Sequence, residues 1–195
     1  MVDSQTSLKA KGALLIPLAL IINSVKNVDW KSAAGLTDED LQRIRKGILA
    51  SQWYERELLE RMAVAVFKVI GQSKPENAYQ FGFGVMAETL LKIYRGPFTE
   101  GNPEELLNKF SQFWNGTWFN SGRIEFSMTD QGALSKLTDP NGIICPVCFV
   151  PMLRGIVMRL MKENGLKNGK VEIPEEALVH KEKLTTLTIK ISYDK

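Results

Sequence analysis

Residues 40–72, DLQRIRKGILASQWYERELLERMAVAVFKVIGQ, decide the fold class of this chain. The stretch begins with an amphipathic helical segment, continues through Gln52-Trp53-Tyr54, and ends in a longer apolar segment. In that last segment apolar side chains recur three or four residues apart, which is the spacing of one face of a helix: Leu58, Leu59, Met62, Val66, Val69 and Ile70. The stretch therefore predicts two helices in close succession, the second of them central in the core.

Further helices are predicted on both sides of this stretch, from apolar spacing and from capping residues. They cover residues 16–27, residues 38–50 after Thr37, residues 76–94, a segment opened by Asn102 and Pro103, and residues 149–164 before Gly165. From Gly122 onward the pattern changes to alternation of apolar and polar residues, which is typical of half-buried strands. The predicted strands cover residues 123–128, 133–137, 171–173 and 186–193. We therefore expect a single α+β domain over residues 1–195, with an N-terminal helical bundle packed on a small C-terminal antiparallel sheet.

The charge balance narrows the range of partners. The chain has 195 residues, of which 25 are basic and 22 are acidic, for a net charge of +3. A charge so small and so dispersed does not predict a nucleic-acid surface. The apolar run at residues 12–22 is well short of the roughly 20 residues that a membrane-spanning helix needs. With only two cysteines, which fit a reducing compartment, the expected location is the cytoplasm.

The two cysteines stand in the sequence Cys145-Pro146-Val147-Cys148. Two thiolates at this spacing can share a zinc ion or form a redox disulfide, and they can also be structural thiols, which is the commonest case. His180 is the only histidine, so a zinc site would need carboxylates or a second subunit to complete it. Cys145 and Cys148 are therefore weak candidates for metal ligands.

Aromatic residues are concentrated between Tyr79 and Phe119. Bulky side chains at helical spacing most often belong to a core, but they also line apolar ligand pockets. If a pocket is present, its candidate lining is Tyr79, Phe83, Met86, Phe110, Trp114 and Trp118.

Several short motifs follow one another in an order that resembles an uncharacterised bacterial domain family, heavily duplicated in myxobacteria. The motifs are Lys11-Gly12-Ala13-Leu14-Leu15, Ile48-Leu49, Trp53-Tyr54, Val69-Ile70-Gly71, Phe81-Gly82 through Tyr94, Phe113-Trp114, Gly122 and Arg154-Gly155. That family is similar in layout to a superfamily of ligand-binding domains. The superfamily includes 4-vinyl reductase-type domains, haem nitric-oxide-binding domains and vesicle-tethering transport proteins.

The resemblance implies an α+β fold with a pocket for a small molecule or an acyl chain, and often a dimer. It implies no catalytic activity. The helical region of this chain contains no histidine that could ligate haem, which argues against haem as a cofactor. The C-terminal cysteines of the 4-vinyl reductase-type relatives are also absent, so their metal site is not implied here.

No pair or triad of residues typical of catalysis stands out in the chain. The leading hypothesis is a non-enzymatic domain that binds a lipid, hydrocarbon or acyl chain, or senses a small molecule, in bacterial signalling or regulation. The alternative is a protein-interaction or homodimerisation module without a ligand. An enzyme is the third hypothesis, with Cys145 or Cys148 as its only chemically active residues.

Overall fold

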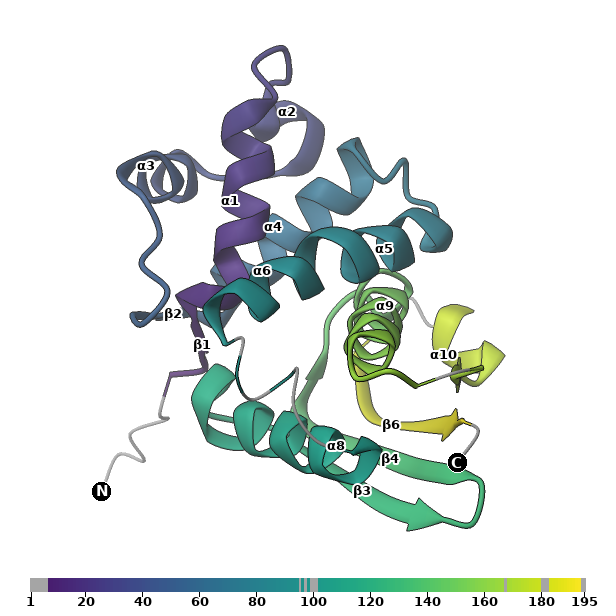
Figure 1. Cartoon of the computed structure of the whole chain (residues 1–195). Coiled ribbons are helices and arrows are strands. Elements are labelled where there is room, and N and C mark those ends of the chain that lie inside the picture. The colour runs from purple at the N-terminus through teal and green to yellow at the C-terminus, as the bar shows by residue number, and fades with distance from the viewer. Residues whose placement is uncertain are drawn as a thin grey trace, which may run out of the picture.

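A computed structural model describes residues 7–94, 96, 98, 102–166, 168–179 and 183–193. It confirms the predicted α+β class, with helices packed on an antiparallel sheet. Figure 1 shows the N-terminal helices on one side of the molecule and the sheet on the other, with one long helix between them.

The N-terminal part is a bundle of helices. Its members are α1 (Gly12–Ser24), α2 (Trp30–Ala34), α3 (Asp38–Lys46), α4 (Arg56–Val69), α5 (Pro75–Phe81), the π-helical turn η1 (Gly82–Met86) and α6 (Ala87–Ile93). The predicted helix over residues 76–94 is therefore continuous but contains a π-helical turn, which sequence periodicity does not reveal.

Helix α1 begins four residues earlier than predicted, so that Pro17 lies inside it. The early start is stabilised by the loop before β2. The first amides of the helix find partners there, with Gly12 N–H donating to Gln52 O at 2.9 Å and Ala13 N–H donating to Ala50 O at 3.1 Å. The first amides of a helix have no hydrogen-bond acceptor within the helix, and here the carbonyl oxygens of the loop accept their hydrogen bonds.

Trp53 and Tyr54 form a strand that the sequence did not predict. β2 (Trp53–Glu55) pairs antiparallel with β1 (Lys9–Lys11), with Ala10 opposite Tyr54. Ala10 also forms an isolated bridge with Phe119, so this small ribbon ties the start of the chain to the aromatic segment.

The sheet is antiparallel, in the order β3-β4-β6-β5. Its strands are β3 (Arg123–Thr129), β4 (Gly132–Ile143), β5 (Lys170–Glu172) and β6 (Leu184–Ser192). Leu137 of β4 lies opposite Leu187 of β6, and both are buried. As predicted, buried and exposed side chains alternate along β4 and β6, with Leu137, Leu187 and Ile189 facing the core. The apolar side chains of Met128 in β3 and Leu134 in β4 depart from the predicted pattern, because both are exposed.

Three helices cover the sheet or separate it from the bundle: α8 (Pro103–Gln112), which continues into the π-helical turn η2 (Phe113–Trp118), α9 (Pro146–Glu163) and α10 (Glu175–Val179). The predicted cap of α8 is confirmed, because Asn102 accepts a hydrogen bond from Glu105 N–H at 2.9 Å. Helix α9 packs against α5 and η1 on one side and against β5 on the other, so it links the bundle to the sheet (Figure 1). Within the described residues, no helix is long and apolar enough to cross a membrane.

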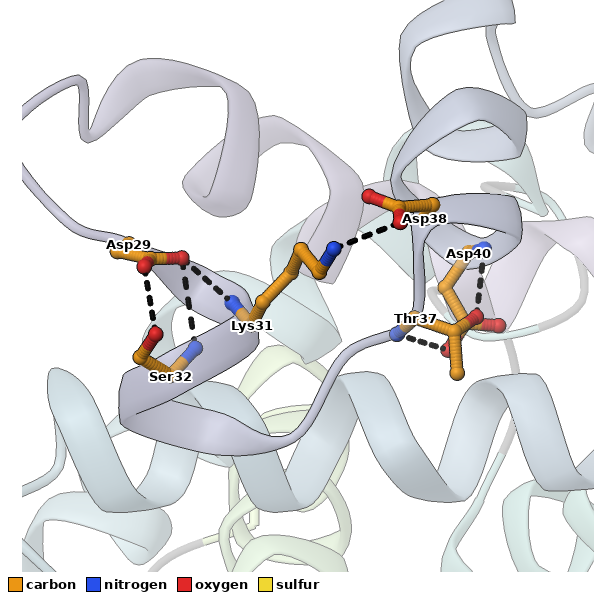
Figure 2. A network of polar contacts seen from close by, with 6 residues as sticks. All are labelled: Asp29, Lys31, Ser32, Thr37, Asp38 and Asp40. Atoms are coloured by element: carbon orange, nitrogen blue, oxygen red, sulfur yellow. Dashed lines mark hydrogen bonds and ion pairs between the residues drawn. The ribbon is translucent and has the colours of Figure 1, made fainter.

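Side-chain caps fix the starts of α2 and α3 (Figure 2). Asp29 accepts hydrogen bonds from the N–H groups of Lys31 and Ser32. Thr37 and Asp40 form a reciprocal capping box, in which each side chain accepts a backbone hydrogen bond from the other residue at 3.1 Å. These contacts explain the helix start that Thr37 predicted.

Asp40 also gives a prediction about stability and pH. Its buried carboxylate accepts hydrogen bonds from Arg61 at 2.7 and 2.9 Å. Burial acts to raise the pKa of Asp40, but the bonds from Arg61 and Thr37 outweigh it and hold this pKa below 3.8. We expect Asp40→Asn to lower the free energy of unfolding by about 1–3 kcal/mol at pH 7, measured by urea denaturation.

The same contacts set the pH at which this difference disappears. Because the pKa of Asp40 is lower in the folded than in the unfolded chain, its contribution is complete above about pH 5 and is lost progressively as the pH falls through the unfolded and then the folded value. The two proteins should then converge in stability. Asp38→Asn is the control, since Asp38 is exposed and its ion pair with Lys31 is worth at most about 1 kcal/mol. Equal losses from the two substitutions would contradict this account.

Candidate functional site

An apolar cavity of about 80 Å³ lies between the helices and the sheet. Its walls come from α1, α4, η1, α6, α8, η2 and α9 and from strands β4 and β6, so segments from most of the chain meet around it. Of the predicted pocket residues, Met86, Phe110, Trp114 and Trp118 line it. Phe110 meets the edge of Trp118 with ring centroids 5.3 Å apart, and the centroid of Trp114 lies 6.1 Å from that of Phe110.

One side of the cavity is polar. Arg56 lies in the first turn of α4 and donates to Glu60 at 2.9 Å, to Asp139 of β4, and to the carbonyl oxygen of Gly142 at 2.9 Å. Arg56, Glu60 and Asp139 are each at most 7% exposed, so this is a buried ionic cluster. Burial raises the pKa of Glu60 against the opposing pull of Arg56.

Ser121 completes this polar side. Its hydroxyl oxygen is buried beside the cavity and has no hydrogen-bond partner among the described residues. Buried polar groups are nearly always hydrogen-bonded to protein, water or ligand. An unpartnered hydroxyl in a cavity wall is therefore available to a bound molecule or to water.

Tyr79 and Phe83, the other two predicted pocket residues, do not line this cavity. Their rings stack 6.1 Å apart on α5 and η1. Cations of α9 lie over them, with the Arg154 guanidinium 5.3 Å from the Tyr79 ring and the Arg159 guanidinium 5.5 Å from the Phe83 ring. Their surroundings are those of a helix–helix contact with cation–π interactions.

Cys145 and Cys148 lie together at the start of α9. Cys145 is half-buried and Cys148 is buried. Among the described residues, no group of three histidine, cysteine or carboxylate side chains is arranged to hold a metal ion. A zinc ion held with residues of a second subunit stays a prediction.

Other hollows in the described part of the molecule include the following two. One is an open surface groove between α2 and α3, whose Asp29, Lys31 and Asp38 already serve the contacts of Figure 2. The other, of about 270 Å³, lies between α4, α5 and α9 and has Cys148 in its wall. Neither combines an enclosed apolar wall with a buried ionic cluster, so the cavity beside Arg56 is the better candidate for a ligand site.

Sequence comparison finds no matching family model and no matching curated protein. The resemblance to the myxobacterial family therefore has no support. Solved structures do match, and they are H-NOX domains. An H-NOX protein from S. oneidensis, in the Fe(II) ligation state, aligns with a TM-score of 0.63 and 9% identity over 95% of this chain and 96% of that chain.

Two further H-NOX structures give the same result. A mutant from K. algicida, Fe(II) and unliganded, has a TM-score of 0.62 and 9% identity over 95% of this chain and 97% of its own. An oxygen-binding H-NOX domain related to soluble guanylate cyclases has a TM-score of 0.59 and 12% identity over 95% of both chains. The chain thus has the H-NOX fold, and the predicted likeness in layout to haem nitric-oxide-binding domains is confirmed.

The expectation against haem was wrong. It was based on the lack of a histidine in the helical region, yet the matching structures include one on protein-induced porphyrin distortion and haem redox potential and one on haem distortion in the H-NOX family. Haem iron is also held by methionine, cysteine or tyrosine in other proteins, so the missing histidine does not decide the question.

The cavity shows what haem would require of this chain. Its lining offers the thioethers of Met86 and Met152 as iron-ligating groups, and His180 lies outside the described residues. An engineered apolar cavity of about 150 Å³ holds one benzene molecule, so a cavity of 80 Å³ does not admit a porphyrin. Binding a haem here would therefore require wall elements such as α9 and η2 to move apart.

Proposed function

We propose that this chain is a small-molecule-binding sensory domain whose ligand occupies the cavity beside Arg56. The observation that carries the proposal is the unpartnered hydroxyl of Ser121, which belongs to the same largely apolar cavity wall as a buried ionic cluster. A compact ligand with one hydrogen-bonding group matches such a wall, because the apolar side gives affinity and the polar side fixes orientation.

The position of the cavity supports a sensory role. Helix α4 contributes Arg56, strand β4 contributes Asp139, and α9 contributes Met152 and Leu153. A ligand that fits one arrangement of these elements better than another shifts the population toward that arrangement. The H-NOX fold supports the same role, since the similar structures include an oxygen-binding domain and one concerned with haem redox potential.

The size of the cavity bears on the ligand class. A volume of about 80 Å³ gives no support to the lipid, hydrocarbon or acyl-chain ligand expected from the sequence. Since a cavity that holds one benzene molecule measures about 150 Å³, every probe requires the walls to move apart, benzene and phenol far less than haemin. Haemin, phenol and benzene are the first three probes, followed by dodecanoate. We expect phenol to bind more tightly than benzene because its hydroxyl can bond to Ser121.

A matched pair of substitutions on β4 tests the site. Leu137→Phe adds bulk to a buried cavity wall, whereas Leu134→Phe adds the same bulk at a side chain that is 45% exposed. We expect Leu137→Phe to weaken phenol binding by at least about tenfold through the loss of cavity space and Leu134→Phe to leave it unchanged, measured by NMR titration and thermal shift.

Haemin is tested in the same proteins by its Soret absorbance. A haem complex that Leu137→Phe prevents would identify the ligand and support the site. The proposal fails if none of the four probes binds, or if both substitutions have the same effect.

The homodimer expected from the sequence stays a prediction. Leu20 and Leu49, 63% and 64% exposed, are the most exposed of the large apolar side chains in the described part of the chain. Light scattering on the purified protein would test it.

A further inference from the structure

The start of α9 holds two thiols in a fixed arrangement. Cys145 has a φ of 50°, in the left-handed region that residues other than glycine rarely adopt, and Pro146 opens the helix immediately after it. Cys148 N–H donates to Cys145 O at 2.8 Å, which closes the turn between them. The two side chains also hydrogen-bond to each other, so the two sulfur atoms lie within reach of one another across this turn.

The two thiols differ in access. Cys145 is half-buried at the end of the helix, whereas Cys148 is 2% exposed, with its sulfur 3.7 Å from the carbonyl oxygen of Ala63 on α4. An oxidant from solvent therefore reaches Cys145 first. Cys148 is placed to react only with its neighbour.

The electrostatic surroundings favour the thiolate at Cys145. A hydrogen bond from the Cys148 thiol lowers the pKa of Cys145 to about 7, against the effect of burial, and the Cys148 amide and the charge of Lys68 add to the lowering. The same interaction and burial raise the pKa of Cys148. A half-buried thiol of low pKa beside a buried one is the arrangement of oxidisable dithiols.

We propose that Cys145 and Cys148 form a dithiol that hydrogen peroxide or an organic hydroperoxide oxidises to an intramolecular disulfide. The Cys145 thiolate attacks one peroxide oxygen, the O–O bond breaks, and a sulfenic acid forms as hydroxide or alkoxide leaves and takes a proton from solvent. The Cys148 sulfur then attacks the Cys145 sulfur. The S–O bond breaks, the S–S bond forms, and the departing oxygen leaves as water with the Cys148 proton. The two sulfurs supply the two electrons that reduce the peroxide.

This activity is independent of the ligand site, since none of its steps involves the cavity beside Arg56. The disulfide would nevertheless fix the first turn of the helix that carries Phe149 and Val150 into the cavity wall. A protein that binds none of the ligand probes would therefore not contradict the dithiol proposal. A protein whose cysteines are not oxidised would likewise not contradict the ligand proposal.

The test is hydrogen peroxide treatment of the reduced full-length chain, followed by thiol counting, intact mass and non-reducing electrophoresis. We expect the loss of both thiols, a mass lower by about 2 Da, a monomeric band and full reversal by dithiothreitol. At pH 7 the folded chain should react roughly ten times faster than the chain unfolded in urea, because a thiol of pKa near 7 is far more ionised than one of ordinary pKa.

Two variants separate the roles of the cysteines, each checked by circular dichroism for native folding. Cys148→Ala should stop at a sulfenic acid that gains about 16 Da and reacts with dimedone. Cys145→Ser should lose its remaining thiol at least about tenfold more slowly than the wild-type chain. If Cys148→Ala does not fold, the oxidation of the wild-type chain and the slower thiol loss of Cys145→Ser are the tests of the proposal.

Four results would overturn the proposal, three of them with the chain as a monomer. These three are retention of both thiols, a folded chain that reacts no faster than the unfolded one, and stoichiometric zinc on the untreated protein that protects the thiols. A disulfide-linked dimer in place of the intramolecular bond would also contradict it.

Discussion

Replacing Arg56 with methionine is expected to lower the free energy of unfolding by about 3–5 kcal/mol at pH 7, because removing one partner of a buried ion pair leaves the other charge uncompensated. Here the guanidinium serves two carboxylates, Glu60 and Asp139, and the carbonyl oxygen of Gly142. Methionine keeps much of the apolar volume of the side chain while removing every donor. Urea denaturation followed by tryptophan fluorescence measures the loss.

The loss of stability caused by Arg56→Met should also depend on pH. Burial already raises the folded-state pKa of Glu60 above its ordinary value, and without Arg56, the main opposing group, this pKa should rise further. The penalty is therefore complete at neutral pH and shrinks as the pH falls through the raised pKa of Glu60 and its carboxyl takes up a proton. A penalty that grows on acidification would contradict this origin.

Arg43→Met is the matched control. Arg43 lies 3.9 Å from Glu39 on α3, and their side chains are 50% and 82% exposed, so the pair is worth less than about 1 kcal/mol. A loss at Arg56 no larger than that at Arg43 would mean that the ionic cluster does not hold α4 against β4.

The features that the sequence predicted correctly are decided by residues close together in the chain. Thr37 caps a helix through Asp40, three residues away, and Asn102 does the same through Glu105. Gly165 has the left-handed φ expected of a residue that ends a helix. Alternation alone revealed β6, because one face of the sheet packs on the core and the other faces solvent.

The features that it did not predict depend on residues far apart. Arg56 and Asp139 are separated by 83 residues, and no local pattern indicates that they meet. The spacing of Arg56 and Glu60 does place them on one helix face, but a surface pair would look the same. Likewise, Trp53 and Tyr54 become a strand only because residues 9–11 lie beside them.

The aromatic residues of the candidate site also make contacts that the local sequence pattern does not predict. Tyr79, Phe83 and Met86 share a face of one continuous helical segment, yet Met86 reaches the cavity while Tyr79 and Phe83 meet the cations of α9. Helical spacing predicts a buried face, but the elements packed along that face decide what each residue contacts.

The second substitution with a large expected effect on stability lies in the contact between η1 and α9. Gly82 and Gly155 allow the two backbones to touch. A Cβ atom on Gly82 would lie 2.1 Å from the carbonyl oxygen of Met152, and one on Gly155 would lie 2.2 Å from that of Tyr79. Both obstacles are backbone atoms of packed helices, so they cannot rotate away as a side chain would.

We expect Gly82→Ala to lower the free energy of unfolding by about 3 kcal/mol, at the upper end of the usual cost of overpacking, since a whole helix must shift. Gly84→Ala is the control from the same π-helical turn, because a Cβ atom there would meet nothing within 4 Å. That change should be neutral or stabilise the protein by up to about 1 kcal/mol, as alanine favours helical backbone over glycine. The two alanines, two residues apart, are thus expected to act in opposite directions.

The displacement of α9 should also reach the ligand site, because Met152 and Leu153 of that helix form part of the cavity wall. Gly82→Ala is therefore expected to weaken the binding of a compact probe such as phenol under conditions where the variant is still folded, while Gly84→Ala leaves binding intact. Urea denaturation and NMR titration on the two variants measure both effects. Equal stability of the two variants would mean that η1 and α9 do not touch, and α9 would then have no fixed place in the cavity wall.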